Sequence, residues 1–362
     1  MSLWVDQYRP KTLDHLSYHH HISQNLKALS KSGDFPHLLI YGPSGSGKKT
    51  RIYATLNEIF GSQVDKLKID VKTFVTPSNR KLEFNVLSSP YHLEITPSDM
   101  GNNDRVVIQD LLKDVASTEQ VDFSSAVNSR TKHRFKIVVI NEADSLSRDA
   151  QAALRRTMEK YSSNIRFILV SNSISNIIPP IKSRTLLIRI PSPSTDDISD
   201  ILYHIGKKES VKFSSSNESE IKGFLKLIAN HSNRNLRRSL LSFETVAMQN
   251  ETINVQGKLS IIDLDWETII KSIADTMNKS RTVASLAKIR VVFYELLSHC
   301  IPARIILKNL LFDLIKTCKS DTAIDNLVAI AAVFDERLSL GSKSIFHLEG
   351  FAAKAMIVLE NS

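Results

Sequence analysis

One short segment limits the possible folds more than any other part of this sequence. Residues Gly42 to Lys48 read Gly-Pro-Ser-Gly-Ser-Gly-Lys and fit the phosphate-loop pattern GxxxxGK. They follow an apolar run that begins at Phe35 and precede an amphipathic run that extends to Phe60. Between a strand and a helix, the glycines let backbone N–H groups point at phosphates, while the lysine reaches the β- and γ-phosphates. The pattern predicts an α/β nucleotide-binding domain, with these residues at the phosphates: Gly42, Pro43, Ser44, Gly45, Ser46, Gly47 and Lys48.

The position after the loop departs from the pattern. A Ser or Thr normally stands there and places its hydroxyl on Mg²⁺, but this chain has Lys49, with Thr50 one place later. One residue along a helix is a rotation of about 100°, so we expect Thr50 not to reach the same ion. Lys49 is itself a cation and cannot coordinate another.

A second segment also lacks a residue that normally binds Mg²⁺. The apolar run 137–140 leads into Asn141 and Glu142, where an Asp normally follows the strand and binds Mg²⁺. Asn141 keeps an oxygen but lacks the charge, while Glu142 stands where the water-activating base is expected. We hypothesise that the chain binds ATP or ADP, holds Mg²⁺ weakly if at all, and hydrolyses ATP poorly. The alternative is that water and Asn141 hold Mg²⁺ well enough for turnover.

Apolar segments of strand length recur up to residue 190. Fully apolar strands that alternate with helices imply a parallel sheet covered on both faces. The strand signals stop at Pro191-Ser192-Pro193-Ser194, and a weaker boundary lies near residues 250–258. We predict a nucleotide-binding domain over 1–190, a small helical domain over 191–255 and a second helical domain over 256–362. The segments are 67–69, 84–86, 92–95, 137–140, 167–170 and 186–190.

The net charge of +9 is concentrated in the first of these domains. Residues 1–190 carry 26 basic and 18 acidic side chains, a net of +8, whereas residues 263–362 carry 12 of each. A local positive excess suggests a polyanionic partner, most simply nucleic acid, although an ordinary basic surface explains it equally well.

Cysteine content and hydropathy exclude other classes of protein. The two cysteines, Cys300 and Cys318, exclude a disulfide framework, and we expect both to be buried as small apolar residues. The sequence has no uninterrupted apolar stretch long enough to span a membrane, and its N-terminus lacks the pattern of a signal peptide. We therefore expect a reducing compartment and no membrane partner.

Four segments outside the loop have counterparts in one protein family. They are 3–11 near the N-terminus, 149–159 after the acidic strand, Ser183-Arg184-Thr185, and Asn235-Leu236-Arg237-Arg238. Together they resemble the replication factor C small subunits of the eukaryotic sliding-clamp loader, with Thr185 in place of the family's Cys. The resemblance covers the whole chain, and Gly-Lys-Lys-Thr and Asn-Glu-Ala are similar to the family member whose nucleotide site is degenerate.

The resemblance implies an architecture, partners and a location. The architecture is AAA+: a RecA-like parallel sheet with flanking helices, a small helical lid domain and an all-α collar domain. The implied partners are four other replication factor C subunits, the ring-shaped sliding clamp PCNA and primer–template DNA, in DNA replication and repair. The large subunits of alternative clamp loaders are further implied partners, and the implied location is the nucleus.

The resemblance also implies roles for particular residues. Asn172 matches the first sensor of the γ-phosphate, and Arg237 matches the second sensor, which reaches from the lid to the chain's own nucleotide. Arg184 matches an arginine finger that projects onto the ATP of a neighbouring subunit, where a planar cation stabilises charge on the phosphoryl group. The residues implied at the adenine and ribose are Val5, Tyr8, Arg9, Pro10 and Ser17.

The implied DNA and clamp contacts rest on position alone. Arg105 stands at the start of an expected helix that extends to residue 116, whose N–H groups could meet a phosphate. Arg80 and Lys81 are secondary DNA candidates, and recognition is expected to depend on phosphates and duplex shape rather than base sequence. Val121 and Phe123 occupy the position where the family touches the clamp, although a core contact is almost as good a reading of Phe123.

A competing interpretation is a self-sufficient P-loop ATPase that acts on DNA, such as a helicase. Lys49 and Asn141 disfavour independent hydrolysis. A stable monomer with full ATPase activity would favour this alternative.

Overall fold

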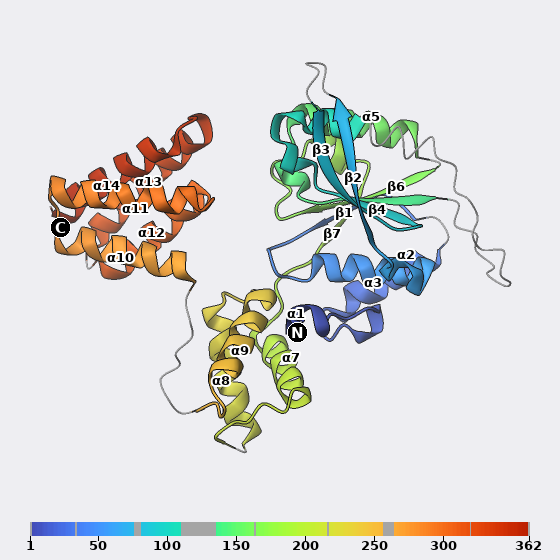
Figure 1. Cartoon of the computed structure of the whole chain (residues 1–362), viewed down its shortest axis with the longest axis horizontal. Helices are drawn as coiled ribbons and strands as arrows, with labels where there is room; N and C mark the ends of the chain where they lie inside the picture. Colours follow the sequence, from blue (N-terminus) through green and yellow to red (C-terminus); the bar gives the residue numbers. More distant parts are fainter. Residues whose placement is uncertain are drawn as a thin grey trace. The chain divides into compact units, whose positions relative to one another are not determined.

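A mixed sheet forms the centre of the part of the chain that contains the phosphate loop (Figure 1). The structure is a computed structural model. It divides into two units, Met1–Ile261 and Ile262–Ser362. The residues that the structure describes are 2–32, 35–75, 81–109, 135–162, 164–215, 217–255, 264–318 and 320–360.

Within the described residues, the sheet has the strand order β2-β3-β4-β5-β6-β1-β7. All neighbouring strands from β4 to β7 in this order are parallel, as predicted. The strands are β1 (Leu38–Tyr41), β2 (Lys68–Val75), β3 (Lys81–Ser88), β4 (His92–Ile95), β5 (Lys136–Ile140), β6 (Ile165–Ser171) and β7 (Leu186–Arg189).

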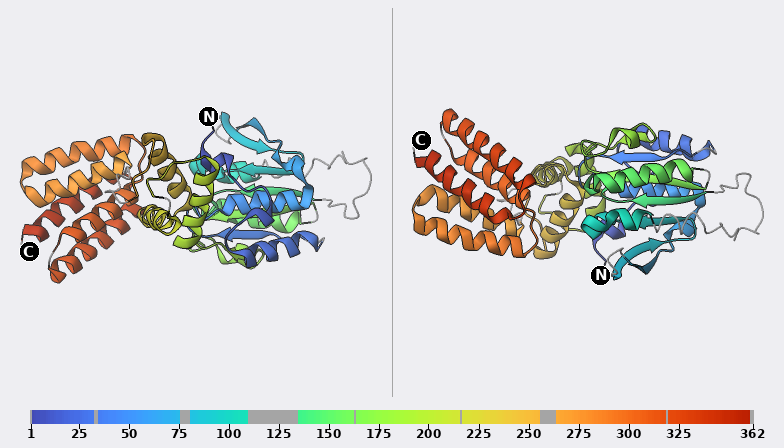
Figure 2. Two further views of the ribbon diagram at one scale, coloured as in Figure 1. Left: turned by 90° about the horizontal axis from the view of Figure 1, so that it is seen from below. Right: turned by 90° about the horizontal axis from the view of Figure 1, so that it is seen from above.

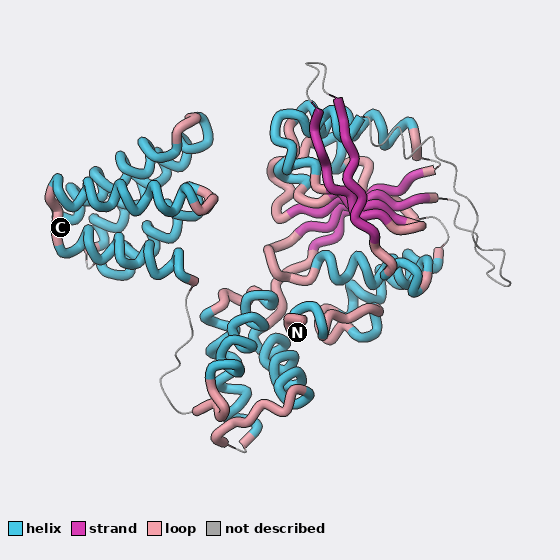
Figure 3. Tube along the Cα trace, in the orientation of Figure 1, coloured by secondary structure: helices cyan, strands magenta, loops and turns pink. Residues whose placement is uncertain are grey.

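The first two strands of this order depart from the prediction. β2 pairs with β3, and β3 with β4, in antiparallel fashion, and Figure 3 shows β2 and β3 as a long pair. Only short connections separate these strands, and antiparallel neighbours need no crossover helix. Along the edge strand β2, Ile69 and Val71 are 72% and 59% exposed, whereas Phe84 and Val86 of β3 are buried. The apolar residues of β2 therefore do not indicate a strand that is buried on both faces.

The parallel strands are buried on both faces because successive side chains enter different clusters. In β1, Leu38 and Ile40 belong to one cluster and Leu39 to the other. β5 and β6 alternate in the same way, as the period of two along a strand requires. The first cluster includes residues of α2 (His20–Lys31) and α3 (Lys48–Phe60), and the second includes residues of α5 (Arg148–Lys160). Figure 2 shows helices running beside the strands of the sheet. The shorter helical elements before β7 are α1 (Trp4–Gln7), η1 (Leu13–His15), η2 (Ser62–Asp65), η3 (Pro97–Asn103), η4 (Ala143–Ser145) and α6 (Pro179–Lys182).

A group of helices follows β7 in the same unit, and we call it the lid. They are α7 (Thr195–Lys208), α8 (Glu218–His231) and α9 (Leu236–Gln249). α7 begins with a capping box, because Ser194 Oγ accepts from Asp197 N at 3.0 Å and Ser194 N donates to the Asp197 carboxylate. Trp4 packs into the lid cluster with its ring 5.6 Å from that of Phe243, so the N-terminal segment is part of the lid core.

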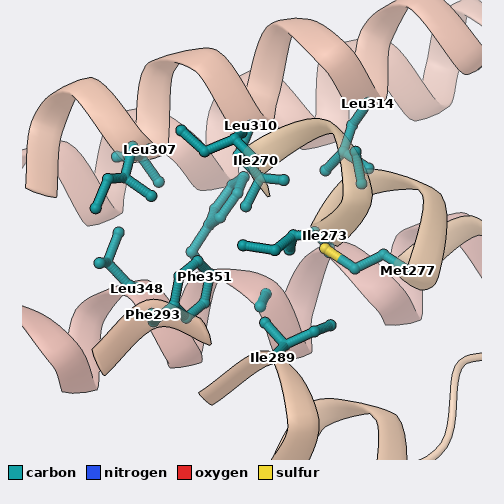
Figure 4. Close-up of a cluster of buried hydrophobic side chains, with 14 of the residues drawn as sticks. Ile270, Ile273, Met277, Ile289, Phe293, Leu307, Leu310, Leu314, Leu348 and Phe351 are labelled. Atoms are coloured by element: carbon teal, nitrogen blue, oxygen red, sulfur yellow. The ribbon is translucent and has the colours of Figure 1, made fainter. Parts of the chain in front are cut away.

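In the described residues of the second unit, the regular secondary structure is all helical. Figure 4 shows Ile270, Phe293 and Phe351 pointing into the space among its helices. The expectation that both cysteines are buried was wrong: Cys300 is exposed and Cys318 is half-buried, because each lies just beyond a helix end. Among the described residues, no helix is both long enough and apolar enough to cross a membrane. The helices are α10 (Asp265–Lys279), α11 (Val283–Ser298), α12 (Ala303–Thr317), α13 (Asp321–Leu340) and α14 (Ser344–Glu360).

Candidate nucleotide site

The phosphate loop lies between β1 and α3, and two of its glycines are packed closely against neighbouring segments. Gly45 and Gly47 have φ angles of +74° and +84°, which are strained for residues that carry a Cβ. A Cβ on Gly45 would lie 1.7 Å from Asn235 Oδ1, and one on Gly47 would lie 2.2 Å from Tyr18 Oη. The loop therefore needs glycine at both positions, and Gly45 lies directly against the lid.

A buried arginine supports the loop from behind. Arg51 of α3 donates to Tyr18 O and to Ser23 Oγ, both at 2.7 Å, and its Cζ lies 4.8 Å from the centre of the Tyr18 ring. Tyr18 in turn donates from Oη to Ser46 O at 3.2 Å. Because Arg51 has no exposed surface, these contacts fix Tyr18 against the loop.

A cavity of about 350 Å³ separates the N-terminal segment from the lid, and we call it the base cavity. Its size and mainly apolar walls suit a base and a ribose. Ile201, Ile205 and Leu240 contribute from the lid side. The predicted residues that line it from the N-terminal side are Val5, Tyr8, Arg9, Pro10 and Ser17.

The lid and the N-terminal segment are joined beside the base cavity. Trp4 N donates to both carboxylate oxygens of Glu244 at 3.2 Å, and Tyr8 Oη donates to the Glu209 carboxylate. Lys208 lies over the Tyr8 ring at 5.5 Å from its centre. Tyr8, one of the predicted adenine and ribose residues, is thus held by the lid as well as by its own segment.

A second cavity of about 220 Å³ lies along the phosphate loop, and we call it the phosphate cavity. Arg9, Gly45, Gly47, Thr50 and Arg237 line both cavities, which places the two side by side. Gly42, Pro43 and Ser46 line neither cavity. The predicted residues along the phosphate cavity are Ser44, Gly45, Gly47, Lys48, Lys49, Thr50, Asn141, Glu142, Asn172 and Arg237.

Lys48 spans the loop and the end of β6. Its Nζ donates to Gly42 O at 2.6 Å, to Pro43 O at 2.8 Å and to Asn172 Oδ1 at 3.0 Å. Burial lowers the pKa of the Lys48 ammonium; Asp144 opposes this shift and Arg237 adds to it. The predicted first sensor, Asn172, therefore contacts the predicted phosphate-binding lysine directly.

Lys49 and Asn141, the two residues that depart from the phosphate-loop pattern, both contact one buried carboxylate. Glu94 of β4 is 4% exposed, and its Oε1 accepts from Lys49 Nζ and from Asn141 Nδ2, each at 2.7 Å. Its Oε2 accepts from Tyr53 Oη. Burial alone would raise the pKa of Glu94, but the hydrogen bonds from Lys49, Tyr53 and Asn141 and the charge of Lys49 bring it below its ordinary value. We call Glu94, Lys49, Tyr53 and Asn141 the Glu94 network.

The side chains at positions 49 and 141 offer a magnesium ion neither the hydroxyl nor the carboxylate that the phosphate-loop pattern specifies. Mg²⁺ takes carboxylate and hydroxyl oxygens and water as ligands, whereas Lys49 offers an ammonium. The Asn141 amide nitrogen donates to Glu94 and to Thr96 Oγ1, and its Oδ1 is buried with no partner among the described residues. The carboxylate between the two positions, Glu94, is already paired with Lys49.

The retained acidic residues lie farther along the same edge. Glu142 is exposed, has a φ of +50°, and accepts from Ser98 Oγ at 3.2 Å. Asp144 Oδ2 accepts the backbone N–H groups of Asn172 at 3.1 Å and Ser173 at 3.3 Å. Asp144 therefore fixes the loop that carries Asn172, while Glu142 faces solvent.

Comparisons with known proteins identify the family of this chain. A family described as the replication factor C subunit 3 C-terminal domain matches residues 266–362, and one described as an RCF1/5-like AAA+ ATPase lid domain matches 200–248. A family described as the DNA polymerase III delta subunit matches 18–194. Replication factor C subunit 5 of Saccharomyces cerevisiae is 56% identical over 99% of this chain and 100% of its own length. This chain belongs to the replication factor C family.

A second relative supports the same assignment, and a solved structure shows the fold. Human replication factor C subunit 3 is 45% identical over 98% of this chain and 96% of its own length. A point mutant of RuvB from Thermotoga maritima is 14% identical, has a TM-score of 0.50, and covers 78% of this chain and 85% of that one. The predicted family and AAA+ fold are confirmed, and the alternative interpretation as a helicase is not favoured.

Arg184 of this replication factor C chain lies outside both cavities. It follows α6 and its guanidinium pairs with Glu159 of α5 at 2.7 Å, while Nη1 donates to Pro180 O at 2.8 Å. The Arg184 and Glu159 side chains are 37% and 43% exposed. Arg184 thus does not contact the chain's own nucleotide cavities, and its role towards a neighbour stays a prediction.

The DNA and clamp candidates are less well defined in this replication factor C chain. Arg105 is exposed at the start of a helical stretch at 104–109. Its backbone N–H donates to Asp104 Oδ1 at 2.7 Å. The Asp104 carboxylate also accepts from Ser147 N and Oγ, so a protein carboxylate already occupies this helix start. Lys81 begins β3, but its side chain lies outside the described residues, as do Arg80, Val121 and Phe123.

Three residues that support the nucleotide site or pair with Arg184 were not predicted from the sequence. Glu94 stands in the apolar strand 92–95, and an acidic residue inside such a strand is the signal that could have found it. Arg51 lies three residues after Lys48 and therefore on the same helix face, which was a weaker signal. Nothing in the sequence distinguishes Glu159 from other charged residues of an exposed helix face.

Proposed function

We propose that this chain is a nucleotide-binding subunit of the replication factor C pentamer that hydrolyses ATP poorly itself and supplies Arg184 to the ATP of a neighbouring subunit. Its partners are four other replication factor C subunits, the sliding clamp PCNA and primer–template DNA. As part of the pentamer, it takes part in loading the clamp onto DNA in the nucleus. The relatives' names as subunits and the AAA+ lid match support this proposal.

One observation carries the proposal: a site suited to binding nucleotide lacks groups that hydrolysis needs, while an arginine suited to hydrolysis lies elsewhere. The joined base and phosphate cavities offer Lys48 and Arg237 to a nucleotide. Hydrolysis also needs a metal ion and a positioned water. The Lys49 ammonium and the Asn141 amide nitrogen instead donate to Glu94, so these two positions offer a metal ion no hydroxyl and no carboxylate.

The surroundings of Arg184 support the second half of the proposal. A guanidinium binds carboxylates and phosphates with the same planar fork, so Glu159 and a γ-phosphate are interchangeable partners. Because the pair with Glu159 is exposed, breaking it is expected to cost less than about 1 kcal/mol. Arg184 can therefore leave Glu159 for a neighbour's nucleotide at little expense.

The decisive experiment is Arg184→Ala in a reconstituted pentamer. We expect the pentamer to assemble and its hydrolysis stimulated by clamp and DNA to fall several-fold or more, because one arginine finger contributes ~10³–10⁵ at the site it serves. Arg189→Ala, at an exposed arginine of β7, is the matched control and should leave turnover unchanged. Arg184→Lys keeps the charge but loses the fork, so it should restore little activity. Unchanged turnover in Arg184→Ala would remove the proposed role.

The remaining parts of the proposal concern DNA, the clamp and the domain boundaries. The basic first 190 residues and exposed Arg105 support a contact with DNA phosphates. Val121 and Phe123 remain the proposed clamp anchors, and loss of clamp binding in Val121→Ala and Phe123→Ala loaders is the test. We keep the boundaries 1–190, 191–255 and 256–362, which the family matches at 18–194, 200–248 and 266–362 support.

A further inference from the structure

We propose that the Lys49 ammonium is a built-in cation that takes the place of Mg²⁺ beside the bound phosphates, and that Glu94 positions it. Nucleotide binding by this chain is then independent of magnesium. This inference rests on the proposed function, because it concerns the same nucleotide site.

The geometry places the ammonium between the two positions that normally share the metal. In P-loop proteins the ion is held between the hydroxyl after the loop lysine and the acid after the second strand. Here those positions are Lys49 and Asn141, and both donate to the same atom, Glu94 Oε1, at 2.7 Å. Both also line the phosphate cavity. A cation is therefore fixed where the two metal ligands would converge.

Glu94 keeps this cation in position rather than free in solvent. Glu94 is 4% exposed, whereas the Lys49 side chain is 41% exposed, so one end of the pair is anchored in the core and the other reaches the cavity. Tyr53 and Asn141 satisfy the remaining capacity of the carboxylate. A buried carboxylate held by three donors is a rigid anchor, because moving any one of them leaves a buried charge less well compensated.

The charges around the phosphate cavity are consistent with binding a polyanion without a metal. Among its described lining residues, the basic side chains are Arg9, Lys48, Lys49 and Arg237, and the acidic one is the exposed Glu142. Glu94 is absent from the cavity wall and lies behind Lys49, so the ion pair presents its ammonium to the cavity. A divalent ion normally offsets phosphate charge in such sites, but here the protein supplies the positive charge itself.

The experiment is titration of the full chain with ADP by calorimetry, in excess magnesium and in excess chelator. We expect the two dissociation constants to agree within about threefold. Magnesium-dependent binding, with affinity more than about tenfold weaker in chelator, would overturn the inference while leaving nucleotide binding intact. No ADP binding in either condition would instead overturn the proposed function, so the two failures are distinguishable.

Variants of Lys49 and Glu94 distinguish the loss of the Lys49 charge from a loss of stability. Lys49→Met should weaken ADP binding in chelator by about tenfold, but it also leaves Glu94 buried without its partner. Lys49→Met/Glu94→Gln removes both charges, so we expect thermal stability to recover while the weak binding persists. The control, Lys66→Met at an exposed lysine outside both cavities, should bind ADP normally. Normal binding by the double variant in chelator would contradict the role of Lys49.

A gain of metal dependence provides the converse test. Lys49→Thr/Asn141→Asp/Glu94→Gln restores the hydroxyl and the acid that the phosphate-loop pattern specifies, and it removes the buried carboxylate that would otherwise lie unpaired beside the new one. We expect this variant to bind ADP more tightly with magnesium than in chelator, and its ADP complex to bind Mn²⁺ detectably by electron paramagnetic resonance. The unmodified chain with ADP should bind no Mn²⁺ at this site. Equal Mn²⁺ binding by both proteins would contradict the inference.

Discussion

The Arg184 guanidinium lies 2.7 Å from the Glu159 carboxylate, and this ion pair joins the segment after α6 to α5 within one chain. Glu159 also accepts from Arg155 Nε at 3.4 Å, so the carboxylate is shared between two arginines. Because Glu159 and a phosphoryl group compete for the same guanidinium, the pair sets how readily Arg184 serves a neighbour.

Glu159→Gln is expected to strengthen the action of Arg184. Removing an exposed competing charge worth about 0.2–1 kcal/mol should raise the kcat/KM for ATP of the assembled loader by no more than about fivefold. Steady-state hydrolysis by the reconstituted pentamer measures this effect. A loss of turnover comparable to that of Arg184→Ala would show instead that Glu159 holds the arginine in its working position.

Gly45→Ala is expected to weaken nucleotide binding. Its Cβ would lie 1.7 Å from Asn235 Oδ1, and its φ of +74° is unfavourable for alanine, so the loop and the start of α9 must move apart. We expect ADP affinity to fall by about tenfold or more and the melting temperature to drop. The control, Gly223→Ala, lies on α8 with no atom within 4 Å of the new Cβ and should be neutral or slightly stabilising. Unchanged ADP binding by Gly45→Ala would contradict the close approach of lid and loop.

The stability of the first unit is expected to fall in mild acid. Burial lowers the pKa of His37 and of His92 to about 4, from an ordinary value of 6.5. His37 Nδ1 accepts from Phe167 N at 3.0 Å, which requires an unprotonated nitrogen. As the pH falls from about 6.5 to about 4, the unfolded chain binds protons at these residues before the folded chain does. The contribution of these two histidines to folding stability is therefore fully present above about pH 6.5 and is lost as the pH falls towards about 4.

Thermal unfolding between pH 7 and pH 4 measures the effect of pH. His37→Asn keeps an acceptor but cannot be protonated in this range, so its melting temperature should depend less steeply on pH. His21→Asn, at an exposed histidine, is the control and should retain the full dependence. Equal slopes for His37→Asn and the unmodified chain would contradict the role given to His37.

Arg105→Ala is expected to reduce DNA binding uniformly across sequences. One phosphate contact contributes about one unit to the slope of log affinity against log salt concentration, so the slope should decrease by about one. The measurement is DNA affinity of the assembled loader at several salt concentrations, with Arg189→Ala as control. A change limited to particular DNA sequences would contradict a phosphate contact.

Much of the fold could be predicted from short sequence patterns, because each pattern reflects a short-range physical requirement. The GxxxxGK loop required a strand before it and a helix after it, and β1 and α3 lie there. The apolar runs at 137–140 and 167–170 required burial on both faces, and both are central strands. The β2–β3 pair was not predicted as antiparallel, because alternation along a strand does not specify its neighbour.

The candidate site was predicted less completely, for a physical reason. Lys49 and Asn141 were visible as departures from a pattern, but their shared partner Glu94 comes from another strand. Tertiary contacts of this kind depend on strand order rather than on local sequence. The Arg184–Glu159 pair escaped prediction for the same reason, since many charged residues of an exposed helix could have been the partner.

Rapid-quench hydrolysis of radiolabelled ATP by the assembled loader tests the central claim most directly. The burst amplitude counts the subunits that split ATP, so Glu142→Gln in this chain should leave it unchanged, whereas Arg184→Ala should lower it. A burst that decreases with Glu142→Gln and survives Arg184→Ala would show that this chain splits its own ATP and lends nothing to its neighbour.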